Sequence, residues 1–175
     1  MSCQILSQEQ QDAARRSGAI LGDCLLMINE FIKPGVTTLE LDERAEEFIR
    51  SKGGVPGFKG YQGFPGTLCT SVNEEVVHGI PKRDKILKEG DIISVDVGTI
   101  VDGYYGDAAR TYGVGEIDEV SKKLLEVTER SLYTDKNVFA KMLYDDNKIN
   151  KVEYDIYCKW FDEFSVPITK YIYMK

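Results

Sequence analysis

Apolar residues recur at helical spacing in the first part of the chain, where they predict an amphipathic helix. Ser7 and Gln10 form a Ser-x-x-Gln capping box, a pattern that opens helices. Lys33-Pro34-Gly35 ends the helix, because proline and glycine interrupt helical hydrogen bonding. The apolar positions between these two signals are Ala13, Ala14, Ala19, Ile20, Leu21, Leu25, Leu26, Ile28 and Ile32.

A second helix follows shortly after the first. Thr37-Thr38-Leu39-Glu40 repeats the capping box, and Gly53-Gly54 ends the helix. The apolar positions at helical spacing are Leu41, Ala45, Phe48 and Ile49. Residues 53–66 carry six glycines and two prolines among aromatic residues, which predicts a shaped loop with short strand pieces.

Strand patterns dominate the middle of the chain. Val76-Val77 predicts a short apolar strand that leads into His78. Residues 91–101 and the stretch after Tyr104 are rich in β-branched residues, and Asp102-Gly103 lies between them. Asp-Gly between two such runs indicates a hairpin with a two-residue type I′ turn.

The remaining patterns are helical, and together the elements predict an α+β fold with an antiparallel sheet. Residues 119–133 are expected to form a helix. Val152, Ile156, Trp160 and Phe164 repeat every four residues and predict a further helix, followed by a strand over 168–174.

The hairpin brings two carboxylates together. If Val101 pairs with Tyr104, Asp107 faces Gly98, and Asp96 lies diagonally from Asp107 on the same face. Two carboxylates so placed can hold one or two divalent ions, since oxygen donors favour ions such as Mn, Fe(II), Co or Mg. The alternative is a pair of solvent-facing carboxylates, neutralised by a nearby basic side chain. Asp96 interrupts an apolar run, and a charge in such a run needs a partner.

Composition excludes several classes of protein. The chain has 175 residues, of which 42% are hydrophobic and 29% charged, as in ordinary globular domains. No apolar run is long enough to span a membrane, and the N-terminus lacks the pattern of a secretory signal. The net charge of −7 disfavours nucleic acid as a partner. The four cysteines are scattered, which is typical of free thiols in the cytosol.

Two further features have both a structural and a functional interpretation. His78 is the single histidine, which excludes zinc motifs that need two or three. It is either a satisfied structural residue or a site residue at the end of a strand. The Gly-Tyr-Gln-Gly-Phe-Pro-Gly segment at 60–66 is either an ordinary loop or the wall of an apolar pocket with Tyr61, Phe64 and Cys69.

Six segments form a series of motifs along the chain: Lys33 to Asp42, Gly60 to Pro65, Cys69 to Glu74, Val77 to Pro81, Lys88 to Val97 and Asp102 to Asp107. In this order, over about residues 3–133, they resemble type I methionine aminopeptidases. The resemblance implies the "pita-bread" fold, of which this chain would hold the N-terminal half. It also implies metal-dependent removal of the initiator methionine from nascent chains in the cytoplasm, with the ribosome as a possible partner.

The resemblance also implies roles for six residues. Asp96 and Asp107 match the first two metal ligands of a site that holds two divalent ions of Co, Mn, Fe or Zn. His78 matches a substrate-binding histidine that stabilises the tetrahedral intermediate. Tyr61, Phe64 and Cys69 match the wall of the pocket for the methionine side chain, and an apolar pocket suits a thioether.

The later family ligands, one histidine and two glutamates, have no match in this sequence, which lacks a second histidine. We therefore expect a half-domain at 1–133, a divergent tail at 134–175, and a truncated chain of doubtful activity. One alternative is a non-catalytic relic that binds peptides or a partner protein. Another is a catalytic chain completed by a second polypeptide.

Overall fold

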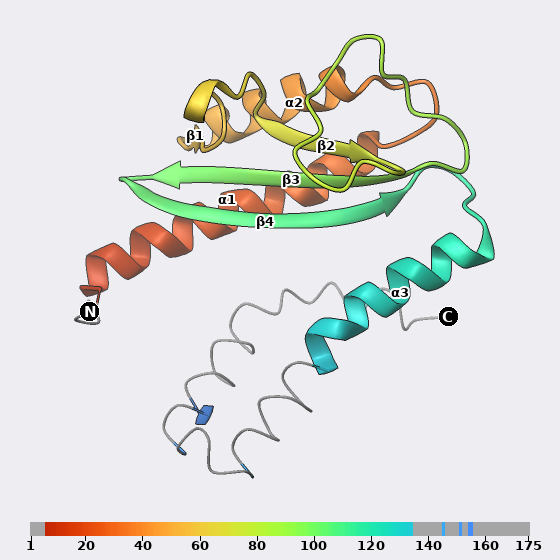
Figure 1. The fold of residues 1–175 in the computed structure, drawn as a ribbon. Helices are drawn as coiled ribbons and strands as arrows, with labels where there is room; N and C mark the ends of the chain where they lie inside the picture. The colour runs from red at the N-terminus through yellow and green to blue at the C-terminus, as the bar shows by residue number, and fades with distance from the viewer. Residues whose placement is uncertain (1–5, 135–144, 146–150, 152–153, 156–175) are drawn as a thin grey trace. The chain divides into compact units, whose positions relative to one another are not determined.

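The computed structural model describes residues 6–134, together with residues 145, 151, 154 and 155 (Figure 1). The chain divides into two compact units, Met1–Lys122 and Lys123–Lys175. Apart from Tyr154 and Asp155, which are helical, the helix expected around 152–164 and the strand at 168–174 lie outside the described residues. The domain boundary expected at residue 133 stays a prediction.

Both N-terminal helices begin at the predicted capping boxes. In helix α1 (Gln8–Phe31), the Gln10 amide donates to Ser7 Oγ at 3.3 Å and the Ser7 amide donates to Gln10 Oε1 at 2.8 Å. In helix α2 (Thr38–Ser51), Thr37 and Glu40 make the same reciprocal pair. These bonds satisfy amides that the first helical turn leaves without partners, which explains why the helices begin there.

The sheet is antiparallel and centres on strand β3 (Ile92–Val101). The short strands β1 (Val55–Pro56) and β2 (Leu68–Val72) pair with one edge of β3, and β4 (Tyr104–Gly113) pairs with the other. Val101 pairs with Tyr104, so the predicted hairpin register is confirmed. Asp102 and Gly103 have φ angles of 50° and 80°, as a type I′ turn requires.

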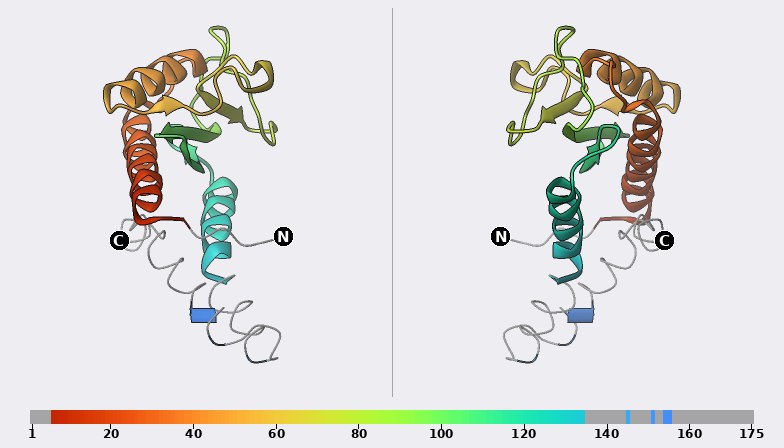
Figure 2. Two further views of the ribbon diagram at one scale, coloured as in Figure 1. Left: turned by 90° about the vertical axis from the view of Figure 1, so that its left-hand side faces the viewer. Right: turned by 90° about the vertical axis from the view of Figure 1, so that its right-hand side faces the viewer.

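Helices α1 and α2 cover one face of this sheet (Figures 1 and 2). Alternate residues of β3 point into the core, where Ile93, Val95 and Val97 are fully buried against the helices. Buried side-chain hydrogen bonds fix α1 to the sheet. Tyr112 donates its hydroxyl proton to the Leu25 carbonyl at 2.9 Å, and the hydroxyl groups of Ser17 and Thr99 lie 2.8 Å apart.

One strand prediction is wrong. Val76 and Val77 do not form a strand but lie in an exposed loop, where they are 85% and 66% exposed. The strand of this region is β2, five residues long, which ends where Asn73 adopts a φ of 53°. All five residues of β2 are buried, including polar Thr70 and Ser71, so the strand shows neither alternation nor an apolar run.

Within the described residues, the expectations for segment 53–66 and for residues 119–133 are confirmed. Segment 53–66 contains β1 and a short 3₁₀ turn, η1 (Tyr61–Gly63), as expected for a shaped loop. Helix α3 (Glu119–Thr134) begins where Asp118 accepts the Ser121 amide at 2.7 Å. The structure is therefore α+β with an antiparallel sheet and flanking helices. Among the described residues, no helix has the length and apolar character that crossing a bilayer requires.

The packing of the core predicts that alanine substitutions at two nearby positions of α1 differ greatly in their effect on stability. Ile28 is fully buried, whereas Leu26 is 52% exposed. We expect Ile28→Ala to lower the free energy of unfolding by about 2–5 kcal/mol because it leaves a cavity. Leu26→Ala, the matched control, should change it by less than about 0.5 kcal/mol. Urea unfolding measures both, and similar losses would contradict the packing of α1 against the sheet.

Candidate functional site

Two carboxylates lie on the face of the sheet opposite the helices. Asp96 on β3 pairs with Ala109, and Asp107 on β4 pairs with Gly98, so the two are diagonal neighbours as the sequence predicts. The Asp96 Oδ1 atom is buried and, among the described residues, has no hydrogen-bond partner. Burial raises the pKa of Asp96 to about 6, and the negative charge of Asp107 adds to this rise.

These two carboxylates fit a divalent cation. A buried carboxylate oxygen without a partner, next to a second negative charge, is an unfavourable arrangement that a bound cation would relieve. Carboxylate oxygens are also suitable ligands for such ions. Within the part of the chain that the structure describes, no three His, Cys, Asp or Glu side chains are grouped to hold a metal. Asp96 and Asp107 would thus be two ligands of a metal site that needs further donors.

Cys69 lies on β2 directly opposite Asp96. Its side chain is buried, and burial raises the pKa of the thiol to about 11, with further contributions from Asp96, Asp107 and Asp42. The thiol is therefore protonated at neutral pH and acts as a small apolar surface beside the carboxylates. Cys69 thus lies beside Asp96, and its expected role as a wall of the site stays a prediction.

His78 lies near the carboxylates in an unusual backbone conformation. Its charge lowers the pKa of Asp96, so the imidazole is within electrostatic reach of that carboxylate. The residue is exposed and has a φ of 58°, in the left-handed region that residues with a side chain rarely occupy. Such a conformation persists only where the surrounding structure enforces it.

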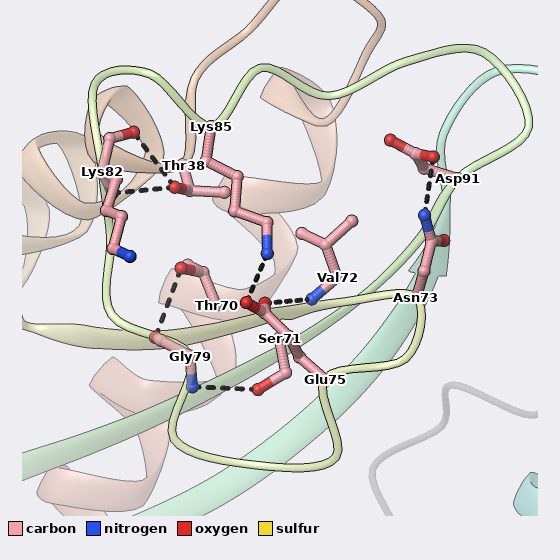
Figure 3. A network of polar contacts seen from close by, with 10 residues as sticks. All are labelled: Thr38, Thr70, Ser71, Val72, Asn73, Glu75, Gly79, Lys82, Lys85 and Asp91. Carbon is pink, nitrogen blue, oxygen red and sulfur yellow. Dashed lines mark hydrogen bonds and ion pairs between the residues drawn. The ribbon is translucent and has the colours of Figure 1, made fainter.

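Contacts between the loop and the sheet enforce this conformation (Figure 3). The Thr70 amide donates to the Gly79 carbonyl at 2.7 Å, and the Gly79 amide donates to Ser71 Oγ at 3.1 Å. A Cβ atom on Gly79 would lie 2.2 Å from the Thr70 carbonyl oxygen, so only glycine fits. Lys85 and Glu75 form an ion pair across the same loop. His78 is therefore held next to a residue that is fixed to β2.

The aromatic residues of segment 57–66 differ in how they reach the site. Tyr61 is 68% exposed on η1, and Phe64 caps that turn. Phe58, which the sequence analysis did not select, lies over Gly98, where its Cε1 atom would be 2.6 Å from an added Cβ. Gly98 pairs with Asp107, so the Phe58 ring covers the sheet beside the carboxylates. Gly98 inside a strand is the sequence signal for such a close approach.

Gly79 provides a test of the loop geometry. We expect Gly79→Ala to lower the free energy of unfolding by about 1–3 kcal/mol, because the added methyl group forces the loop away from β2. Gly18→Ala is the control, since an added Cβ there meets nothing within 4 Å. In a helix that change should stabilise the protein by about 0.5–1 kcal/mol. Equal effects in thermal unfolding would show that the loop is not fixed to β2.

The raised pKa of Asp96 predicts that replacing this residue stabilises the fold by an amount that depends on pH. A carboxyl group whose pKa is higher in the folded than in the unfolded chain stabilises the fold when protonated. This stabilisation is present below the ordinary pKa of 3.8 and is lost as the pH rises toward 6. Without added metal, Asp96→Asn should therefore raise the melting temperature at pH 7.5, and the gain should shrink at pH 4.5.

The control for this measurement is Asp23→Asn, which removes an exposed carboxylate from α1. It should show a much smaller change between the two pH values. If Asp96→Asn lowers the melting temperature equally at both pH values, the carboxylate is not destabilised by its surroundings.

Comparison with known proteins finds relatives that are metallopeptidases. Residues 12–150 match the model of metallopeptidase family M24. The chain is 52% identical over 133 residues to a methionine aminopeptidase of Clostridium acetobutylicum, covering 75% of this chain and 53% of that protein. It is 55% identical over 119 residues to methionine aminopeptidase 1 of Bacillus subtilis, covering 68% and 48%.

A solved structure shares the fold as well. The crystal structure of methionine aminopeptidase from Thermotoga maritima matches with a TM-score of 0.75 and 39% sequence identity. The match covers 78% of this chain and 55% of that one. This chain thus has the fold of the pita-bread proteins over the matched residues, and it spans about half the length of the curated relatives that it matches.

Proposed function

Because the chain belongs to metallopeptidase family M24, we propose that it carries the first half of a methionyl aminopeptidase site. The observation that supports this most directly is the pair of carboxylates, Asp96 and Asp107, on one face of adjacent strands. The pair occurs in a chain more than 50% identical to proteins named methionine aminopeptidase. The substrate class would be peptides and proteins with an N-terminal methionine.

In this proposal the chain's own residues have distinct roles. Asp96 and Asp107 bind the metal, and their shared negative charge favours its binding. A divalent ion held by them would lower the pKa of a water molecule and would polarise the peptide carbonyl. His78, exposed at the edge of the site, donates a hydrogen bond to the scissile group and stabilises the charge that develops on it.

The methionine side chain would bind beside the carboxylates. Cys69 offers a small, uncharged surface there, and Tyr61 and Phe64 supply the aromatic part of the pocket. We add Phe58 to this set, because its ring lies over Gly98. A flexible thioether adapts well to such mixed apolar walls.

The finer parts of the proposal rest on the resemblance to methionine aminopeptidases. The metals would be Co, Mn, Fe or Zn, two ions per complete site. Nascent chains would be the source of the N-terminal methionines, which places the activity in the cytoplasm and makes the ribosome a possible partner.

A second candidate function is binding without catalysis. It is favoured by the absence, among the described residues, of a third metal-ligating side chain grouped with Asp96 and Asp107. In this case the pocket would bind N-terminal methionine peptides or a partner protein without hydrolysing them.

Hydrolysis of a Met-Ala-Ser peptide by the purified chain, with Mn²⁺ or Co²⁺ added, tests the proposal. We expect Asp107→Ala to abolish any turnover and to weaken Mn²⁺ binding by at least about tenfold, because it removes one of two described ligands. Calorimetric titration measures the metal affinity independently of the hydrolysis.

The results separate the two functions. Turnover that is lost in Asp107→Ala supports the aminopeptidase. Peptide binding without turnover supports the binding protein. Turnover that is equal in both chains identifies a contaminating enzyme, and a chain that binds neither Mn²⁺ nor peptide contradicts both functions.

A further inference from the structure

Helix α2 carries two buried polar side chains on its inner face. Thr38 is fully buried and Asp42 is 4% exposed, and they lie one helical turn apart among apolar residues of the core. A buried polar group is costly unless it is hydrogen-bonded. Thr38 and Asp42 are neither proposed metal ligands nor proposed pocket walls. We therefore infer their role from their hydrogen-bond partners.

Asp42 holds the beginning of β2. Its Oδ1 atom accepts hydrogen bonds from the Thr67 and Leu68 amides, both at 2.7 Å. Burial raises the pKa of Asp42, and the two amide bonds act in the opposite direction. Leu68 is the first residue of β2, and Cys69 follows it. Asp42 therefore fixes the point from which the strand brings Cys69 opposite Asp96.

Thr38 holds the other end of the segment 67–82. Its hydroxyl oxygen accepts the Lys82 amide at 2.9 Å and its hydroxyl proton points to the Lys82 carbonyl at 3.2 Å (Figure 3). The Leu39 amide also donates to this carbonyl, at 3.3 Å. The hydroxyl group of Thr38 is thus the hydrogen-bond partner of the Lys82 amide, four residues after His78.

Segment 67–82 is therefore hydrogen-bonded to α2 at both of its ends. Within it, Gly79 is bonded to Thr70 and Ser71. Close to its two ends, an added Cβ on Gly66 would lie 2.9 Å from Pro81. With both ends of the segment bonded to α2 and Gly79 bonded to β2, His78 has little freedom to leave its left-handed conformation.

We propose that Thr38 and Asp42 are positioning residues that set the place of His78 and Cys69 beside the carboxylates. In this role they control the affinity for the peptide and not that for the metal, because Asp96 and Asp107 lie on β3 and β4. The proposal rests on the proposed function for its effect on peptide binding. The effect on His78 itself is independent of that function.

The single histidine makes the test direct, because histidine labelled with ¹³C at Cε1 gives one ring signal in the NMR spectrum of this chain. Thr38→Val removes the hydroxyl group and keeps the shape. We expect it to shift or broaden the His78 signal in the free chain and to weaken Met-Ala-Ser binding by about tenfold, the size typical of supporting residues. The Mn²⁺ affinity should stay within about twofold, as for independent sites.

Two variants act as controls. Thr38→Ser restores the hydroxyl group and should return the His78 signal and the peptide affinity to within about twofold of the original. Thr99→Val removes another fully buried threonine hydroxyl, one that bonds α1 to β3 instead of the loop. It should lower stability to a similar degree and leave the His78 signal in place. If Thr38→Val does not fold, Thr38→Ala replaces it, because it removes the same hydroxyl group without placing a methyl group against the Lys82 amide.

Each outcome decides the question. An unchanged His78 signal in Thr38→Val, or an equal change in Thr99→Val, overturns the positioning role. A parallel loss of Mn²⁺ affinity also overturns it, because the effect is then general. If the original chain binds neither Mn²⁺ nor peptide, the proposed function fails, while the His78 signal in the free chain still supports or overturns the positioning of His78.

Discussion

Backbone pairing between β3 and β4 is the constraint on which the candidate site depends. The type I′ turn at Asp102-Gly103 joins the strands with the twist that hairpins prefer, and it fixes which residues face each other. Side chains alternate between the two faces of a strand, so this one register sends Val95 and Val97 into the core and Asp96 to the opposite face. Core packing and the position of the carboxylates thus follow from the same ladder of hydrogen bonds.

The packed sheet also explains how the fold tolerates a site that lowers its stability. Asp96 has a buried oxygen without a partner and a second carboxylate beside it, both unfavourable for folding. The rest of the sheet compensates with an apolar face packed against α1 and α2. An arrangement that is unfavourable for the fold and would be relieved by a cation is typical of functional sites.

Local patterns predicted most of this structure. The two capping boxes, the Asp-Gly turn and the diagonal placement of Asp96 and Asp107 are set by residues close in sequence, and the structure confirms each of them. The errors arise where distant contacts decide. β2 is buried on both faces and holds polar Thr70 and Ser71 because the loop residue Gly79 bonds to it. Phe58 over Gly98, and Thr38 and Asp42 beneath segment 67–82, likewise depend on partners far along the chain.

The turn at Asp102-Gly103 has a consequence for how this sequence can vary. Asp102 is exposed, and exposed turns are where insertions usually accumulate. Here, a slip of one residue along β4 would move Asp107 to the helix side of the sheet and bring Ala108 to its place. An added residue has to be absorbed within the turn, as in three-residue loops with a bulge. The length of this solvent-exposed turn is thus tied to the position of the carboxylates on the strand that follows it.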